Sequence, residues 1–244
     1  MRAVRTSDIA RLFFRNKRTA QKRLRRLLDG AFTRPIVTDL AAESRWTLTR
    51  AGHAVLEEAS DDPVAPFRSA PRADARHFAH HDLLVAVWVS VALGARRSDA
   101  SLLAFRPEWA LRSEDPEAPL VPDALILLQK GNGELTLALE ADCGTERPPI
   151  LASKVARYNA LTEAGSPLFG ARPDAVLFVT STERRARRIA LHLRDRGAIP
   201  LIFGAVPHVL VDGGLTTGLA TAETLGDENA TGNPFVQGLL TGVE

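Results

Sequence analysis

Two apolar runs on either side of a short turn sequence constrain the fold of this chain more than any other feature. The segment reads VPDALILLQKGNGELTLALEAD, residues 121–142, and contains Asn132-Gly133, a dipeptide favoured in two-residue turns. The runs are rich in Leu, Ile and Ala, which is typical of a buried pair of strands. A chain of 244 residues with 45% hydrophobic side chains can bury one sizeable core and a smaller second one around such a hairpin.

Three carboxylates lie at the open end of the predicted hairpin. A two-residue turn pairs Asp123 with Asp142, and a turn longer by two residues pairs Asp123 with Glu140; both registers place the three acids on one face, whereas a three-residue loop breaks the cluster. Clustered carboxylates repel one another unless a cation binds them, and Mg²⁺ and Mn²⁺ prefer oxygen ligands. The pattern predicts a metal site at Asp123, Glu140 and Asp142. The alternative is that these acids cap exposed strand ends or pair with Arg147.

The helix expected at about 150–164 adds polar groups to the acidic end of the hairpin. Lys154, Arg157 and Tyr158 stand at i, i+3 and i+4, so one helix face can carry all three toward the carboxylates. A lysine there can orient a water or neutralise charge that develops on a phosphate. The predicted catalytic residues are therefore Asp123, Glu140, Asp142 and Lys154. The alternative for Lys154 is an ordinary surface position on an amphipathic helix.

The segments around the hairpin predict alternating helices and strands. A long apolar helix is expected at 77–94 and a strand at 102–106, before the hairpin at about 120–142. After the helix at 150–164 come the strand DAVLFVT, the helix TERRARRIALHLRDRG and the strands IPLIF and HVLVD. This order predicts an α/β sandwich around a mixed sheet.

The first 26 residues form a basic block. They contain ten Lys or Arg and one acid, Asp8, although the whole chain has a formal net charge of only +2. A basic block attached to an acidic body predicts a dedicated surface for a polyanion.

The basic block also has the pattern of two helices. Thr6 or Ser7 is expected to cap the first, in which Ile9, Leu12 and Phe13 share a face. The second is RTAQKRLRRLLDG, with an apolar stripe at Ala20, Leu24, Leu27 and Leu28 and a stop at Gly30.

A short strand, a polar loop, a second strand at 46–49 and another helix follow the basic helix. This is the order of a winged helix-turn-helix, whose second helix would enter the major groove of double-stranded DNA. The alternative is a solvated basic helix packed on the main domain. The expected DNA-binding residues are Arg15, Lys17, Arg18, Lys22, Arg23, Arg25 and Arg26.

Composition divides the chain into four segments. The predicted boundaries are a DNA-binding domain at 1–60, a proline-containing linker at 61–76, the α/β domain at 77–212 and a flexible Gly/Thr-rich tail at 213–244. One cysteine excludes an internal disulfide, and neither a signal peptide nor an apolar run of about 20 residues is evident, so the expected location is the cytoplasm, with no membrane partner.

These residues resemble two nested families. Asp123 after Pro122, followed by Glu140-x-Asp142, is similar to the PD-(D/E)xK nuclease superfamily, which implies a restriction-endonuclease-like α/β domain with Asp123 and Glu140 as metal ligands. More narrowly, residues 5–205 resemble the replication-relaxation family of plasmid-associated proteins. The segments that carry this resemblance are the basic amino terminus, His81 before the apolar helix, VPDALILL, LEADCGTE, Lys154 to Tyr158 and VLFVTSTERRAR.

One position departs from the superfamily pattern, which would place lysine at position 142. This chain has Asp142. Either Lys154 has taken over the role from the neighbouring helix, or the site binds metal poorly and the domain only grips DNA.

Three functions therefore remain open. The first is a DNA-binding protein of plasmid or mobile-element replication or mobilisation whose nuclease-like domain nicks DNA with Mg²⁺ or Mn²⁺. The second is a non-catalytic accessory protein for replication, and the third is a winged-helix transcription regulator whose second domain senses a ligand or mediates dimerisation. Double-stranded DNA is the expected partner, and a second copy of the chain and plasmid replication or mobilisation proteins are candidate partners.

Overall fold

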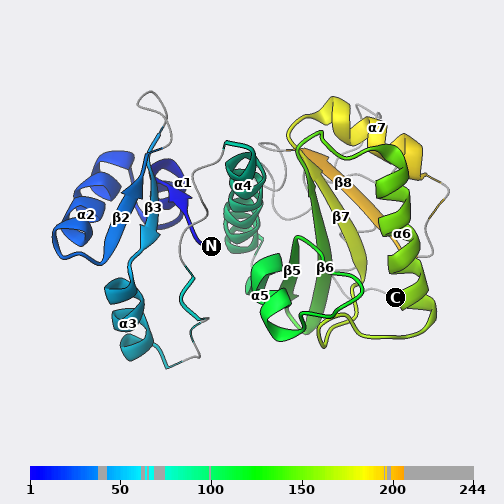
Figure 1. The fold of residues 1–244 in the computed structure, drawn as a ribbon, viewed down its shortest axis with the longest axis horizontal. Coiled ribbons are helices and arrows are strands. Elements are labelled where there is room, and N and C mark those ends of the chain that lie inside the picture. Colours follow the sequence, from blue (N-terminus) through cyan, green and yellow to red (C-terminus); the bar gives the residue numbers. More distant parts are fainter. Residues whose placement is uncertain are drawn as a thin grey trace. The chain divides into compact units, whose positions relative to one another are not determined.

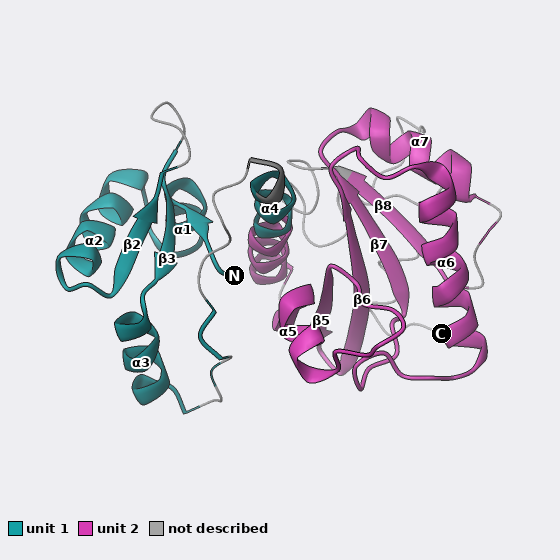
Figure 2. Cartoon of the chain, viewed as in Figure 1, with its two compact units in different colours: residues 1–85 teal, residues 86–244 magenta. Residues whose placement is uncertain are grey.

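The computed structural model describes residues 1–37, 43–61, 64, 66–68, 75–98, 100–194, 196 and 199–205. Most of the predicted linker at 61–76, the predicted strand HVLVD and the whole predicted tail at 213–244 lie outside the described residues. The chain divides into two compact units, residues 1–85 and 86–244 (Figure 2). The domain boundaries expected at residues 60 and 77 stay predictions.

The first unit follows the predicted order of two helices, two strands and a helix. Its elements are β1 (Val4–Arg5), α1 (Thr6–Phe13), α2 (Lys17–Asp29), β2 (Thr33–Ile36), β3 (Arg45–Leu48) and α3 (Arg50–Ala59) (Figure 1). The three strands form an antiparallel sheet in the order β1-β3-β2.

Two details of the predicted first helix are wrong. Neither Thr6 nor Ser7 caps α1, because Arg5 holds the cap position and Thr6 is already helical; the Thr6 hydroxyl instead accepts a hydrogen bond from the indole of Trp46 at 2.9 Å. Phe13 is 62% exposed, since the buried side of α1 is formed by Thr6, Asp8, Ala10 and Leu12.

Helix α2 begins at a cap that the sequence reading missed. The Asn16 side chain accepts a hydrogen bond from the Thr19 N–H at 2.9 Å, which satisfies one of the unpaired donors at the start of the helix. The helix ends at Gly30, as predicted. Ala20 and Leu24 are buried, whereas Leu28 is partly exposed.

The second unit contains the end of α4 (Ala75–Arg97) and a mixed sheet. Its further elements are β4 (Ser101–Pro107), α5 (Glu108–Glu114), β5 (Ala124–Lys130), β6 (Gly133–Asp142), α6 (Pro148–Glu163), β7 (Ala175–Thr180), α7 (Glu183–Leu193) and β8 (Leu201–Ala205). The strand order is β4-β5-β6-β7-β8, antiparallel from β4 to β6 and parallel from β6 to β8. The fold is mixed α/β, and α5 was not predicted.

The hairpin has a different turn from the one expected. Lys130 pairs with Gly133, so the two turn residues are Gly131 and Asn132. Gly131 has a φ of 58°, and glycine in the first turn position supplies this left-handed conformation at little cost. The pairing of Asp123 with Asp142 is therefore wrong. The pairing ends at Ala124 and Leu139, and the Asp123 N–H donates to the Leu139 carbonyl at 3.0 Å.

Both faces of the five-stranded sheet are buried. On one face, side chains of α6 and α7 share a core with Leu125, Val176, Phe178 and Phe203 from three of the strands. On the other face Ile126, Leu139, Leu177 and Ile202 are fully buried. Residues 86–97 of α4 lie on that side of the sheet (Figure 1).

Helix α4 is more apolar than expected. By length and composition alone, Phe78–Arg97 could cross a membrane, with a mean hydropathy of 1.5. The expectation that the chain has no apolar run of about 20 residues did not take account of the many valine and leucine residues in this stretch. Because 67% of this stretch is buried, its apolar side chains have partners within the protein, as in the core helix of a globular domain.

Candidate functional site

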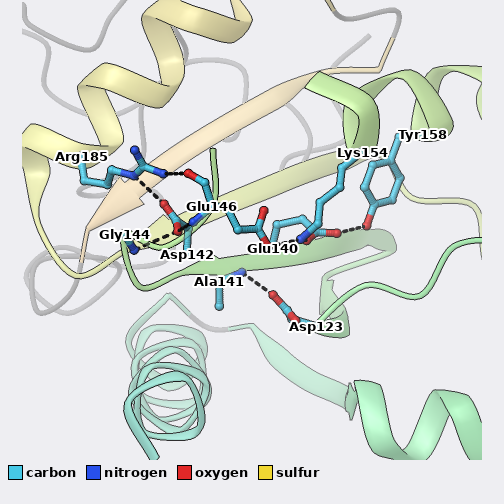
Figure 3. Close-up of polar contacts among 9 residues, drawn as sticks. All are labelled: Asp123, Glu140, Ala141, Asp142, Gly144, Glu146, Lys154, Tyr158 and Arg185. Carbon is cyan, nitrogen blue, oxygen red and sulfur yellow. Dashed lines mark hydrogen bonds and ion pairs between the residues drawn. The ribbon is translucent and has the colours of Figure 1, made fainter. Parts of the chain in front are cut away.

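The carboxylates of Glu140 and Asp142 lie on one face of β6. Residues 140 and 142 are two apart in the strand, and both side chains point toward α6 and α7 (Figure 3). Each side chain is only 3% exposed. Buried carboxylates require hydrogen-bonding or cationic partners, and each of these two has its own set.

Glu140 is held by two side chains of α6. Lys154 Nζ donates to Glu140 Oε2 at 2.7 Å, and the Tyr158 hydroxyl donates to Glu140 Oε1 at 2.7 Å (Figure 3). The i, i+4 spacing of Lys154 and Tyr158 brings both groups to one carboxylate, as the helix period predicted. Arg157, expected on the same face, is exposed instead.

Asp142 is held by α7 and by the loop that follows β6. Arg185 Nε donates to Asp142 Oδ2 at 2.6 Å, and the N–H groups of Gly144 and Glu146 donate to Asp142 Oδ1 at 2.9 and 3.3 Å. Arg185 also donates to the backbone carbonyl of Glu146. The cation that pairs with Asp142 is thus Arg185, and not Arg147, which holds the N-cap position of α6 and is exposed.

Two further acids complete the site. Ala141 N–H donates to Asp123 Oδ2 at 2.7 Å, which fixes the Asp123 side chain against the β6 backbone. Glu146 Oε1 accepts a hydrogen bond from Lys154 Nζ at 2.7 Å, so Lys154 bridges Glu140 and Glu146 (Figure 3). The sequence reading missed Glu146 and Arg185, although both belong to segments, LEADCGTE and TERRAR, that had been singled out for other reasons.

The site does not fit a divalent cation in the observed arrangement. Both oxygens of Glu140 accept hydrogen bonds from Lys154 and Tyr158, and both oxygens of Asp142 accept hydrogen bonds from Arg185 and the backbone. Among the described residues, no group of three or more His, Cys, Asp or Glu side chains is arranged to hold a metal ion. The charge of these buried carboxylates is balanced by Lys154 and Arg185.

The first unit carries a separate basic surface. A hollow of about 1160 Å³ lies along α2 and is also lined by Pro35, Val37 and Trp46 from the region of β2 and β3. Arg15 and Arg23 are exposed but do not line the hollow, and Lys17 forms an ion pair with Glu43 at 2.7 Å. The predicted DNA-binding residues that line it are Lys17, Arg18, Lys22, Arg25 and Arg26.

Comparison with protein families identifies the family of this chain. A family model described as Replication-relaxation matches residues 1–168, more than half of the sequence. The chain belongs to the replication-relaxation family. This confirms the resemblance noted from the motifs. No curated protein and no solved structure matches the chain.

The replication-relaxation match includes most of both surfaces just described. It contains the whole of α2 and the residues Asp123, Glu140, Glu146, Lys154 and Tyr158, whereas Arg185 lies outside it. Membership of the replication-relaxation family points to a role in plasmid or mobile-element replication or relaxation, and so to involvement with DNA.

The charges of this replication-relaxation protein's carboxylate site depend on burial. Burial raises the pKa of Glu140; Lys154 opposes this effect and Asp123 reinforces it, so that the pKa lies at about 7. Burial disfavours the charged form of Lys154, but the negative charge of Glu140, the hydrogen bonds to Glu140 and Glu146 and the charge of Asp123 together outweigh this and raise the Lys154 pKa. Lys154 is less buried and also contacts Glu146, so it keeps its proton and Glu140 is the member of the pair that titrates near neutral pH.

Glu140→Gln is expected to change the pH dependence of stability. The Glu140 pKa is about 7 in the folded protein and near 4.5 in the unfolded chain, so the folded state binds its proton more tightly. The wild type should therefore lose up to about 3 kcal/mol relative to the variant as the pH rises from 4.5 through 7. Urea denaturation at several pH values measures this difference. The matched control is Glu134→Gln at an exposed position of β6; parallel profiles for Glu140→Gln and wild type would contradict the expectation.

Proposed function

We propose that the first unit is a winged helix-turn-helix that binds double-stranded DNA, in the service of plasmid or mobile-element replication or mobilisation. One observation carries this proposal: exposed Lys and Arg side chains of α2 line a hollow beside an antiparallel pair of strands. Helix α2 is the second helix of the unit. Strands β2 and β3 follow it, where a winged helix-turn-helix has its wing, and α3 comes after them. Membership of the replication-relaxation family supports DNA as the partner.

The charges in the hollow suit a phosphate backbone. Arg18, Lys22 and Arg25 stand at i, i+4 and i+7, so they follow one face of α2. Each Lys or Arg that neutralises a phosphate releases condensed counterions, which favours binding at low salt. Lys17 already contacts Glu43 and so contributes less net charge.

Arg18→Ala/Lys22→Ala/Arg25→Ala is expected to weaken duplex binding and to lower the slope of log affinity against log salt. Each lost phosphate contact removes about one unit of that slope, so a decrease of up to about three is expected. Fluorescence anisotropy of a labelled duplex at several salt concentrations gives both quantities.

The matched control is Arg11→Ala/Arg15→Ala/Arg23→Ala. It removes the same charge from exposed positions of the same unit that do not line the hollow. A smaller loss in the control than in the hollow variant supports α2 as the DNA-contacting helix. Equal losses, or an unchanged hollow variant, would refute it.

A second candidate function, DNA nicking by a PD-(D/E)xK-type domain, is favoured by the position of Lys154. The superfamily pattern has a lysine at position 142, which this chain lacks, but Lys154 of the neighbouring helix lies beside Glu140 at 2.7 Å. A cation there could stabilise negative charge that develops on a phosphate. Participation of Mg²⁺ or Mn²⁺ would require an arrangement in which Lys154 or Arg185 releases a carboxylate. The proposed DNA binding by α2 does not depend on a metal ion.

A further inference from the structure

Helix α7 carries a second basic surface, on the second unit. Its inner side packs into the core through Ala186, Ile189, Ala190 and Leu193. Its outer side is rich in arginine, because the segment reads ERRARRIALHL. Arg185 turns inward to Asp142, whereas Arg184, Arg187 and Arg188 are exposed.

The three outer arginines differ from other cations of the second unit in their surroundings. Arg106 and Arg112 form ion pairs with Glu114 and Glu108, respectively. Within the part of the chain that the structure describes, no carboxylate lies within ion-pair distance of Arg184, Arg187 or Arg188. The outer side of α7 therefore presents positive charge that the described part of the protein does not neutralise.

A hollow of about 360 Å³ adjoins this side of α7. Arg188 and His192 line it from α7, and Pro148 and Leu151 line it from α6. Arg185 also lines it and at the same time binds Asp142, so the hollow adjoins the carboxylate site. A ligand in this hollow would lie beside both the basic surface and that site.

We propose that this hollow and the outer arginines of α7 hold the phosphodiester backbone of DNA, as a contact separate from α2. The planar guanidinium group offers several donors in a geometry that matches phosphate oxygens, and arginines at i, i+3 and i+4 lie close enough to bind adjacent phosphates. The choice of DNA rests on the proposed function of the first unit. The place of the contact rests on α7 alone.

The test is Arg184→Ala/Arg187→Ala/Arg188→Ala in the full chain, measured by anisotropy with a labelled duplex over a salt series. The expected result is weaker binding and a log–log salt slope lower by about two to three. The three side chains are exposed, so thermal unfolding should be unchanged. The charge-matched control is Arg112→Ala/Lys130→Ala/Arg172→Ala, on other parts of the same unit.

The outcomes separate this contact from the one on α2. Weakening by the α7 variant beyond that of its control supports the proposal, and weakening by both α7 and α2 variants supports two contacts. An unchanged α7 variant beside a weakened α2 variant overturns the α7 contact and leaves the function of α2 standing. A weakened α7 variant beside an unchanged α2 variant supports the α7 contact and refutes the α2 contact. Equal weakening by the α7 variant and its control also overturns the α7 contact.

Discussion

Replacing Arg185 by methionine is expected to lower the free energy of unfolding by about 3 to 5 kcal/mol. Methionine keeps an unbranched stem but removes the cation from Asp142, whose side chain is 3% exposed. The N–H groups of Gly144 and Glu146 still donate to Asp142, yet they do not balance its charge. The variant also loses the hydrogen bond from Arg185 to the carbonyl of Glu146. Chemical denaturation near neutral pH measures the loss.

Two further variants show whether this loss comes from the unpaired charge. Arg188→Met changes an exposed arginine of the same helix and should alter stability by no more than about 0.5 kcal/mol. Asp142→Asn in the Arg185→Met background removes the buried charge at nearly constant volume, so it should recover part of the loss. If Arg185→Met is as stable as Arg188→Met, the ion pair does not stabilise the fold.

The pairing of Asp142 with Arg185 shows what the sequence could not predict. The two residues are 43 positions apart, and they meet because β6 pairs with β7 in parallel, with Asp142 opposite Thr180. The start of α7 at Glu183 then brings Arg185 beside the end of β6. Arg147 was the cation nearest in sequence, but it stands at the N-cap position of α6 and its side chain is exposed.

The contacts of Glu140 could be predicted from the sequence because they depend on the period of one helix. Lys154 and Tyr158 are separated by one helical turn, and a helix that packs on β6 brings both to the same carboxylate. The hairpin register depended on a finer choice between Gly131-Asn132 and Asn132-Gly133 as the turn. Both choices are compatible with two-residue turns, so the local sequence did not decide the partner of Asp123.

The basic helix was predictable in position, and its functional face was predictable only in part. Composition marked all the cations of residues 15–26 alike. The structure separates Arg18, Lys22 and Arg25, which line the hollow, from Arg23, which does not, because the turn of the helix relative to β2 and β3 decides which side chains face the strands. That rotation follows from burial of Ala20 and Leu24.

The last prediction concerns the second candidate function. Lys154→Met is expected to slow nicking of supercoiled plasmid in Mg²⁺ or Mn²⁺ buffer by about 10²- to 10³-fold, while duplex affinity stays unchanged. Lys154 stays protonated because the neighbouring carboxylates, Glu140 first among them, together raise its pKa against the effect of burial, so it suits electrostatic stabilisation and not proton abstraction. The fold should tolerate the change, because the pKa of Glu140 is already about 7 and a proton can replace the lost cation.

The controls decide between an enzyme and a non-catalytic DNA-binding protein. Arg157→Met removes an exposed cation three residues along the same helix and should leave nicking intact. Asp142→Lys in the Lys154→Met background restores the superfamily pattern. Recovery of part of the nicking rate would show that a lysine at the site is needed, whether β6 or α6 carries it. Thermal unfolding of each variant separates loss of nicking from loss of folding. Wild-type protein that nicks no faster than Glu140→Gln, with several metals and on supercoiled and single-stranded substrates, would exclude the nickase and leave DNA binding by α2 as the function.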